Sequence, residues 1–340
     1  MLGPTGRRIC AAVAAAVTLA ASCTSAPDPI PAGLAGSDGP CGAVRRAVPN
    51  PAQPDLPVNI SEPTGSGAPF TGGSCSDAGR PVILLGHGIG ASSPTVYAAL
   101  VTHLVGQGFV VIEPGYAGGF DQPQQYRAEN EGFVAGVAAS PRADVSRLGF
   151  VGHSWGAGMV PAMMQAAAAR GWGTAATWAV QMAPAWEFGV GAGPIALPSN
   201  ARVLVVNYAD DATVDMAIGS EALAAMDLPD SHKQHLLIHG DGSVAPGLRA
   251  DHFLPSTVVG TPGSPFRLDH FDRWAAWRPI DAWARCALDG AWCDTDLADM
   301  GTHPDGSAVT RASIGLDLDD VGPPATAECA SVLNPRRCPA

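Results

Sequence analysis

Six short runs of mostly apolar residues lie between residues 81 and 239 of the chain. The runs occupy residues 81–86, 109–112, 147–151, 177–182, 202–206 and 235–239. A continuous apolar run of this length, unlike an alternating one, is typical of a strand in a parallel sheet that helices cover on both faces. A further strand is predicted at residues 56–61. The pattern therefore predicts a sheet whose central strands are buried on both sides.

Helical spacing appears between these runs. Apolar residues recur three and four positions apart over residues 96–105, and Gly106 and Gly108 end that helix. Further helices are predicted at residues 127–139 and 159–170, one begins near Met216, and an amphipathic stretch covers residues 271–280. Strands that alternate with helices predict the α/β class, with a mostly parallel central sheet and right-handed crossovers.

The first residues follow the pattern of an export signal. Arg7 and Arg8 precede an uncharged, mostly apolar stretch at residues 9–21, which is too short to span a bilayer. The stretch ends in small residues before Cys23 and resembles a bacterial lipoprotein signal, in which that cysteine carries the lipid. Cleavage near Ala26 without a lipid is the alternative. We expect a signal peptide at 1–22, a Pro/Gly-rich tether at 23–54, a catalytic domain at 55–311 and a tail at 312–340.

The charge and the cysteine content narrow the functional class and the expected location of the protein. The net charge is −12 and charged residues make up only 15% of the chain, which excludes an electrostatic binder of nucleic acid. Six cysteines remain after Cys10 and Cys23 are set aside, and an even number in an exported chain favours disulfides. Proximity in the sequence predicts the pairs Cys286–Cys293 and Cys329–Cys338, which leaves Cys41–Cys75. The expected location is the cell envelope or the medium.

The candidate chemistry begins at the pentapeptide Gly152-His153-Ser154-Trp155-Gly156. It matches Gly-x-Ser-x-Gly, follows an apolar strand and opens a helix of small residues, which is the context of a nucleophile elbow. Glycine is needed on both sides of the serine because the strand and helix backbones approach closely there. Ser154 is therefore the predicted nucleophile, and an incidental serine in a strand–helix turn is the alternative.

Residues 81–285 resemble the α/β-hydrolase superfamily, in particular its lidless branch of dienelactone hydrolases, chlorophyllases and cutinase-like polyester hydrolases. The second motif that carries the resemblance is Gly86-His87-Gly88-Ile89-Gly90, which matches the family's His-Gly oxyanion loop. The resemblance implies the α/β-hydrolase fold, with helices on both faces of the sheet and no lid domain. It also implies that the backbone N–H groups of Ile89 and Trp155 form an oxyanion hole, with His87 in a structural role.

A third motif, at residues 181–186, is similar to the Gln-Ala-Pro-Trp of the polyester hydrolases, although its spacing differs. The similarity implies that Trp186 lines the acyl cleft, and a core or surface tryptophan is the alternative. The short segment between residues 186 and 201 leaves no room for a helical lid. The dienelactone hydrolases proper use a cysteine nucleophile, so their substrate does not carry over to this chain.

The superfamily order of nucleophile, acid and histidine implies the rest of the triad. The acid is expected just after the strand at 202–206, and the family pattern places it on Asp211, with Asp210 or Asp215 as alternatives. Asp215 is also suited to cap the following helix. The base is predicted to be His252, on a loop beyond the strand at 235–239. His239, at the end of that strand, and His270, at a helix start, are the alternatives.

These residues predict an exported serine hydrolase that cleaves carboxylic esters through an acyl-enzyme. The alternatives are a secreted acyltransferase with the same triad and a non-catalytic surface module on a hydrolase scaffold. The expected substrate is a small-molecule, lipid or polymer ester. We expect no cofactor, no metal site, no nucleic-acid partner and a monomer, which a lipid on Cys23 would attach to a membrane.

Overall fold

The computed structural model describes residues 30–244, 247–256, 268–318, 321 and 334. The expected signal peptide, Cys23 and the expected Cys329–Cys338 disulfide lie outside these residues. In the part of the chain that is described, no helix has both the length and the apolar character needed to cross a bilayer.

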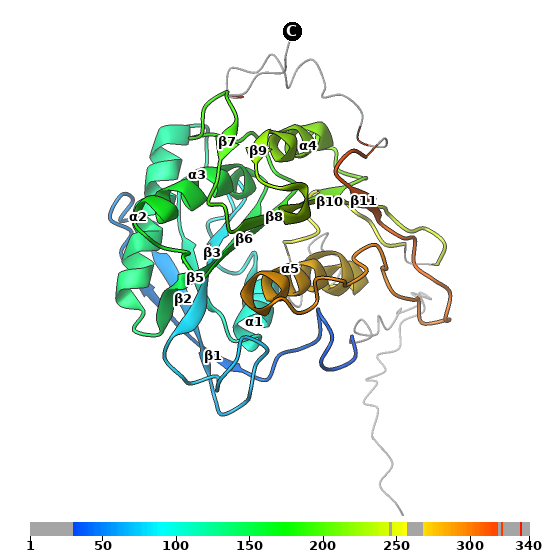
Figure 1. Ribbon diagram of the computed structural model, residues 1–340, viewed down its shortest axis with the longest axis horizontal. Helices are drawn as coiled ribbons and strands as arrows, with labels where there is room; N and C mark the ends of the chain where they lie inside the picture. The colour runs from blue at the N-terminus through cyan, green and yellow to red at the C-terminus, as the bar shows by residue number, and fades with distance from the viewer. Residues whose placement is uncertain (1–29, 245–246, 257–267, 319–320, 322–333, 335–340) are drawn as a thin grey trace, which may run out of the picture.

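A nine-stranded, mostly parallel sheet forms the centre of the molecule (Figure 1). Its strands lie in the order β1-β2-β4-β3-β5-β6-β8-β10-β11, and β1, β2 and β11 run antiparallel to their neighbours. The bounds are β1 (Gly42–Val48), β2 (Val58–Thr64), β3 (Arg80–Gly86), β4 (Val110–Pro114), β5 (Ala143–His153), β6 (Ala176–Met182), β8 (Ala201–Tyr208), β10 (Lys233–Ile238) and β11 (Ser313–Gly315). The short strands β7 (Ile195–Ala196) and β9 (Met226–Asp227) pair separately. The α/β class that the apolar runs predict is confirmed.

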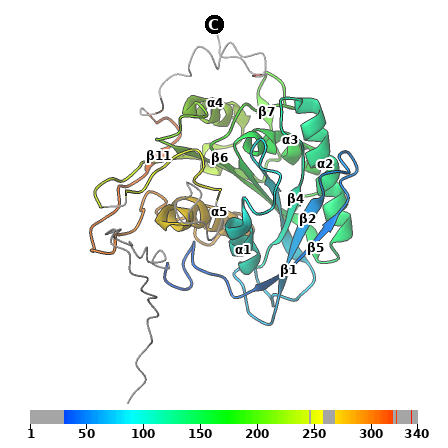
Figure 2. The same ribbon diagram turned by 180° about the vertical axis from the view of Figure 1, so that it is seen from behind.

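Helices cover both faces of the sheet (Figures 1 and 2). One face packs against α1 (Ala98–Gly106) and α5 (Arg278–Asp289), which continues from the π-helical turn at Asp272–Trp277. The other face packs against α2 (Gln122–Ala139), α3 (Trp155–Ala169) and α4 (Met216–Ala225). A short 3₁₀ turn at Asp230–His232 leads into β10.

The central strands bury their side chains alternately into two separate cores. In β3, Ile83 and Leu85 belong to the core under α1 and α5, whereas Val82 and Leu84 belong to the core under α2 and α3. All four side chains are fully buried or nearly so. Because successive side chains of a strand point to opposite faces, a doubly covered strand needs apolar residues at every position. This is the physical reason for the continuous apolar runs.

Two segments differ from the sequence-based prediction. The strand β1 falls inside residues 23–54, which were expected to be a tether, and β11 falls inside the expected tail at 312–340. Both are edge strands. The side chains of β1 are mostly exposed and include Arg45 and Arg46, so no apolar run marks this strand. The folded part of the chain therefore begins earlier than the apolar pattern indicates.

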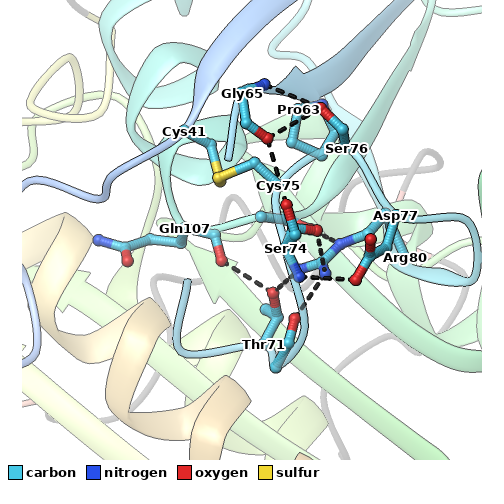
Figure 3. Close-up of a disulfide and its surroundings, with 12 residues drawn as sticks. Cys41, Pro63, Gly65, Thr71, Ser74, Cys75, Ser76, Asp77, Arg80 and Gln107 are labelled. Atoms are coloured by element: carbon cyan, nitrogen blue, oxygen red, sulfur yellow. Dashed lines mark hydrogen bonds between the residues drawn. A yellow bond between two sulfur atoms is a disulfide. The ribbon is translucent and has the colours of Figure 1, made fainter. Parts of the chain in front are cut away.

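Two of the predicted disulfides are present, Cys41–Cys75 and Cys286–Cys293. The first joins the start of β1 to the loop before β3, and Figure 3 shows Arg80 beside it. The buried Arg80 guanidinium donates hydrogen bonds to the carbonyl oxygens of Gly108 and Gly72, at 2.8 and 2.6 Å. Disulfides form and persist in oxidising compartments, so the two pairs indicate an extracytoplasmic location.

Removal of the Cys41–Cys75 disulfide should destabilise the protein more than removal of the other one. The two bonds close loops with sequence separations of 34 and 7 residues. Loop-closure entropy then predicts a loss of about 4 kcal/mol for Cys41→Ala/Cys75→Ala and about 2–3 kcal/mol for Cys286→Ala/Cys293→Ala. Urea unfolding of the two double variants measures the difference. Equal losses would show that strain or residual denatured-state structure, and not loop length, sets the contribution.

Candidate active site

The three candidate catalytic residues come from three loops at one edge of the sheet. Ser154 directly follows β5, Asp211 follows β8, and His252 lies on the loop after β10. These strands are parallel, so their carboxyl ends meet at the same edge, where ligands of open α/β sheets bind. Segments that are about 100 residues apart in the chain therefore meet there.

Ser154 occupies a strained turn between β5 and α3. Its backbone dihedrals are φ 54° and ψ −117°, in a region that residues other than glycine rarely adopt. The flanking glycines are required by close packing, because an added Cβ on Gly152 would lie 2.5 Å from the Cα of Ala157. On Gly156 it would lie 2.3 Å from the carbonyl carbon of Gly86. The geometry is that of the predicted elbow, and Ser154 lines a cleft.

A chain of hydrogen bonds joins Ser154, His252 and Asp211. The Oγ of Ser154 lies 2.9 Å from Nε2 of His252, and Nδ1 of His252 lies 2.7 Å from Oδ2 of Asp211. Because an ionised carboxylate only accepts hydrogen bonds, the proton of the neutral imidazole lies on Nδ1. Nε2 is then free to accept the hydroxyl proton of Ser154, which is the protonation state that a general base needs.

The carboxylate of Asp211 is held in its ionised form. Its Oδ1 accepts hydrogen bonds from the backbone N–H groups of Thr213 and Val214, at 2.7 and 3.0 Å. Burial by itself would raise the pKa of Asp211. The hydrogen bond from His252, the electrostatic attraction between the two side chains and the two backbone donors outweigh burial, so the pKa lies below the ordinary value of an aspartate. The site therefore keeps a negative charge beside the imidazole.

The two alternative carboxylates have other partners. Asp215 caps α4, where its Oδ1 accepts a hydrogen bond from Ala217 N–H at 3.0 Å. Oδ2 of Asp210 accepts from Ala250 N–H at 3.1 Å, and Asp210 N–H donates to the carbonyl oxygen of Ala250. Asp210 thus anchors the loop that carries His252, while its neighbour Asp211 contacts the imidazole.

The alternative histidines also lie elsewhere. His239 forms a 2.8 Å hydrogen bond with Ser313, at the edge where β11 joins the sheet. The Nε2 of His270 donates to the carbonyl oxygen of Met300 at 2.6 Å, and its ring stacks on Trp274. Of the three predicted candidates for the base, the structure brings His252 to Ser154.

The loop after β3 carries one of the two predicted backbone donors, the Ile89 N–H, and the start of α3 carries the other, the Trp155 N–H. Residues 88–91 form a turn closed by a hydrogen bond from Ala91 N–H to the carbonyl oxygen of Gly88, with Gly90 at φ 75°. Within the described residues, neither the Ile89 N–H nor the Trp155 N–H has a hydrogen-bond acceptor. Two unpaired backbone donors beside a nucleophile are the features of an oxyanion hole.

The buried side chain of His87 connects this loop to the segment after β4 through hydrogen bonds. Its Nδ1 donates to the carbonyl oxygen of Gly88 at 2.7 Å, and its Nε2 accepts from Tyr116 N–H at 3.2 Å. The rings of His87 and Tyr116 stack with their centroids 3.6 Å apart. Burial lowers the pKa of His87 to about 4, although the hydrogen bond to Gly88 opposes this shift. The imidazole is therefore neutral at physiological pH, and its contacts are those of a structural residue.

A cleft of about 410 Å³ opens over Ser154. Its lining is mostly apolar and includes Ile89, Ala91, Val96 and Phe253, of which Ile89 and Phe253 are also exposed at the rim. The described residues that line it include no Asp, Glu, Lys or Arg.

Trp186, which was predicted to line the acyl cleft, is not among these lining residues. Its ring packs edge-on against the ring of Trp155, with centroids 6.2 Å apart. The Trp155 ring is buried and donates from Nε1 to Gln125 at 2.9 Å. Trp155 can therefore offer the cleft its backbone N–H while its side chain packs into the core beneath the elbow.

Three residues at the site carried no sequence-based prediction. Tyr97 and His153 line the cleft, and Glu129 of α2 lies fully buried behind Gly86. Burial raises the pKa of Glu129 well above its ordinary value, and neither of its carboxyl oxygens has a partner among the described residues. Proximity to Ser154 was a signal for His153. No signal marked Tyr97 or Glu129, because the contacts of Tyr97 with His153 and of Glu129 with Gly86 join residues that are distant in the sequence.

Comparison with known proteins adds nothing to the site: no protein-family model matches the chain, and no curated protein sequence matches it. Among the described residues, no group of three or more His, Cys, Asp or Glu side chains is arranged to hold a metal ion. The molecule thus has a mostly parallel α/β sheet with a Ser154–His252–Asp211 hydrogen-bond chain at the carboxyl edge of its strands.

Proposed function

We propose that this protein is a serine hydrolase of the α/β-hydrolase fold that cleaves carboxylic esters. The observation that carries the proposal is the unbroken hydrogen-bond chain from Ser154 through His252 to Asp211, of which Ser154 and His252 line a cleft. The strained backbone of Ser154 and the two unpaired N–H groups beside it add support. The fold assignment is supported by the strand order and by the places of the three residues after β5, β8 and β10.

The proposed reaction uses these groups in two steps. Ser154 Oγ attacks the ester carbonyl carbon while His252 Nε2 takes the hydroxyl proton, and Asp211 stabilises the imidazolium. The N–H groups of Ile89 and Trp155 bind the oxyanion of the tetrahedral intermediate. His252 then protonates the departing alcohol. In the second step His252 takes a proton from a water molecule as that water attacks the acyl-enzyme carbonyl carbon. The bond to Ser154 Oγ then breaks, His252 returns the proton to Oγ, and the acid is released.

The lining of the cleft supports uncharged esters as the substrate class. Apolar side chains surround Ser154, and no lysine or arginine is present among the described lining residues to pair with a substrate carboxylate. Transfer of a charged acyl group into this environment would leave the charge unpaired, which costs several kcal/mol. We propose that the enzyme acts outside the cytoplasm, and the sequence motif at Cys23 supports attachment to the cell envelope through a lipid.

The test is a panel of p-nitrophenyl esters with acyl chains of two to sixteen carbons, together with the charged succinate monoester. We expect turnover of the neutral esters, much slower turnover of the succinate, and labelling of Ser154 by a fluorophosphonate, located by peptide mass spectrometry. Added ethanol separates hydrolysis from acyl transfer, because a transferase would form the ethyl ester as its main product. Absence of both turnover and labelling would contradict the proposed function.

A further inference from the structure

The side chain next to the nucleophile contacts the backbone of the base. His153 Nε2 lies 2.7 Å from the carbonyl oxygen of His252, and both groups are buried. His153 precedes Ser154 in the chain, so one imidazole ring spans the distance between the nucleophile elbow and the loop that carries the base. Asp211 orients the His252 ring, whereas His153 holds the His252 backbone.

The other nitrogen of His153 faces Tyr97. The Tyr97 hydroxyl lies 2.8 Å from His153 Nδ1, and the same hydroxyl lies 2.9 Å from the backbone N–H of Gly88. Ser256 lines the same cleft as Tyr97. Tyr97 is fully buried at the start of α1. It therefore connects the oxyanion loop to the elbow and, through His153, to the loop that carries His252.

The groups at the two ends of this series of hydrogen bonds, the Gly88 N–H and the His252 carbonyl oxygen, determine the direction of each bond between them. A carbonyl oxygen only accepts, so the proton of His153 lies on Nε2 and points to His252. Burial lowers the pKa of His153 to about 3, so the ring is neutral and its Nδ1 is an acceptor. A backbone N–H only donates, so Tyr97 accepts from Gly88 and gives its own proton to His153. We call this ordered set, Gly88 N–H to Tyr97 to His153 to His252 carbonyl, the Tyr97–His153 relay.

We propose that Tyr97 and His153 are positioning residues that fix the oxyanion loop and the backbone of the base relative to Ser154 at the same time. The inference rests on the proposed function, because it concerns the machinery of that reaction. Tyr97→Phe removes the acceptor of the Gly88 N–H, and His153→Leu removes the donor to the His252 carbonyl oxygen. Either change also leaves the other side chain without its partner in the relay, so the positions of the oxyanion loop and of the base are no longer coupled. A displacement of about 1 Å of a catalytic group lowers the rate by about 100-fold.

The anchoring of Ala250 by Asp210 makes the relay testable on a folded protein. Ala250 stays bonded to Asp210 in any relay variant, so the loop keeps one of its attachments. The variants are Tyr97→Phe, His153→Leu and His153→Gln. Glutamine carries an NH₂ group that donates and a carbonyl oxygen that accepts, and it is always neutral, so His153→Gln can retain both hydrogen bonds. Tyr208→Phe is the matched control, because the Tyr208 hydroxyl is equally buried and has no partner among the described residues.

The measurements are kcat and KM on a neutral p-nitrophenyl ester, the rate and final extent of Ser154 labelling by a fluorophosphonate, and Tm. We expect kcat to fall by about 10-fold in Tyr97→Phe and by about 100-fold in His153→Leu, with KM little changed and every molecule still labelled in the end. His153→Gln should recover most of the loss, and Tyr208→Phe should keep the wild-type kcat. The double variant Tyr97→Phe/His153→Leu should have a kcat only slightly below that of His153→Leu, because both substitutions interrupt the same series of hydrogen bonds.

Three results would overturn the relay. They are wild-type kcat in Tyr97→Phe and His153→Leu, a loss in Tyr208→Phe equal to that in Tyr97→Phe, or a fall in the labelled fraction that accounts for the whole loss of activity. In each of these cases the wild type is still labelled at Ser154 and still turns over ester, so the proposed function stands. A wild type that neither labels nor hydrolyses ester overturns the proposed function, and the relay with it.

Discussion

Replacement of Ser154 by alanine is expected to lower kcat for ester hydrolysis by about 10⁵- to 10⁶-fold. The variant keeps the His252–Asp211 pair and the oxyanion donors but has no oxygen to form the acyl-enzyme. Steady-state assays and fluorophosphonate labelling measure the effect. Ser93→Ala is the control, because Ser93 is exposed and its hydroxyl bonds to Thr95. Ser154→Ala that is still labelled would show that another residue is the nucleophile.

The same position should show a conflict between stability and activity. The dihedral φ of 54° strains serine and alanine alike, whereas glycine adopts it freely. Ser154→Gly is therefore expected to be inactive yet about 1 kcal/mol more stable than Ser154→Ala in urea unfolding. Equal stability of the two variants would show that the surrounding contacts, and not the backbone strain, dominate at this turn.

Replacement of His252 by alanine is expected to lower kcat nearly as much as Ser154→Ala, and the double variant should be little worse than either single one. The residues of a triad act as a unit, so their losses do not add. His239→Ala is the matched control, because His239 bonds to Ser313 and not to Ser154. Substantial activity in His252→Ala together with inactive His239→Ala would move the base to the end of β10.

The acid has a similar pair of variants. Asp211→Asn should lower kcat by about 10⁴-fold, because an amide that donates to Nδ1 favours the imidazole tautomer with its proton on Nε2. Asp215→Asn should keep the wild-type kcat, since asparagine also caps helices well and the cap of α4 is preserved.

Much of the fold follows from local properties of the sequence. A strand covered on both faces needs apolar residues at every position, so the runs at 81–86 and 147–151 marked central strands before any pairing was known. The glycines around Ser154 marked the elbow, because the required backbone approach excludes a Cβ. Edge strands obey no such constraint, which is why β1 and β11 were missed.

Which residues make up the candidate active site is decided by the tertiary structure. Asp210, Asp211 and Asp215 carry the same carboxylate, and in the sequence only the family pattern favoured Asp211. The path of the chain after β8 decides which carboxylate faces His252 and which ones hold Ala250 or cap α4. The same holds for Trp186, whose ring packs on Trp155 and does not line the cleft. The sequence by itself determined the layers of the sheet and the position of the nucleophile, since both depend on a few adjacent residues. Only the tertiary structure showed the hydrogen bond between Ser154 and His252 and the Tyr97–His153 relay. Three of these four contacts join residues 56 to 99 positions apart, and hydrogen-bond geometry at such separations is set by packing.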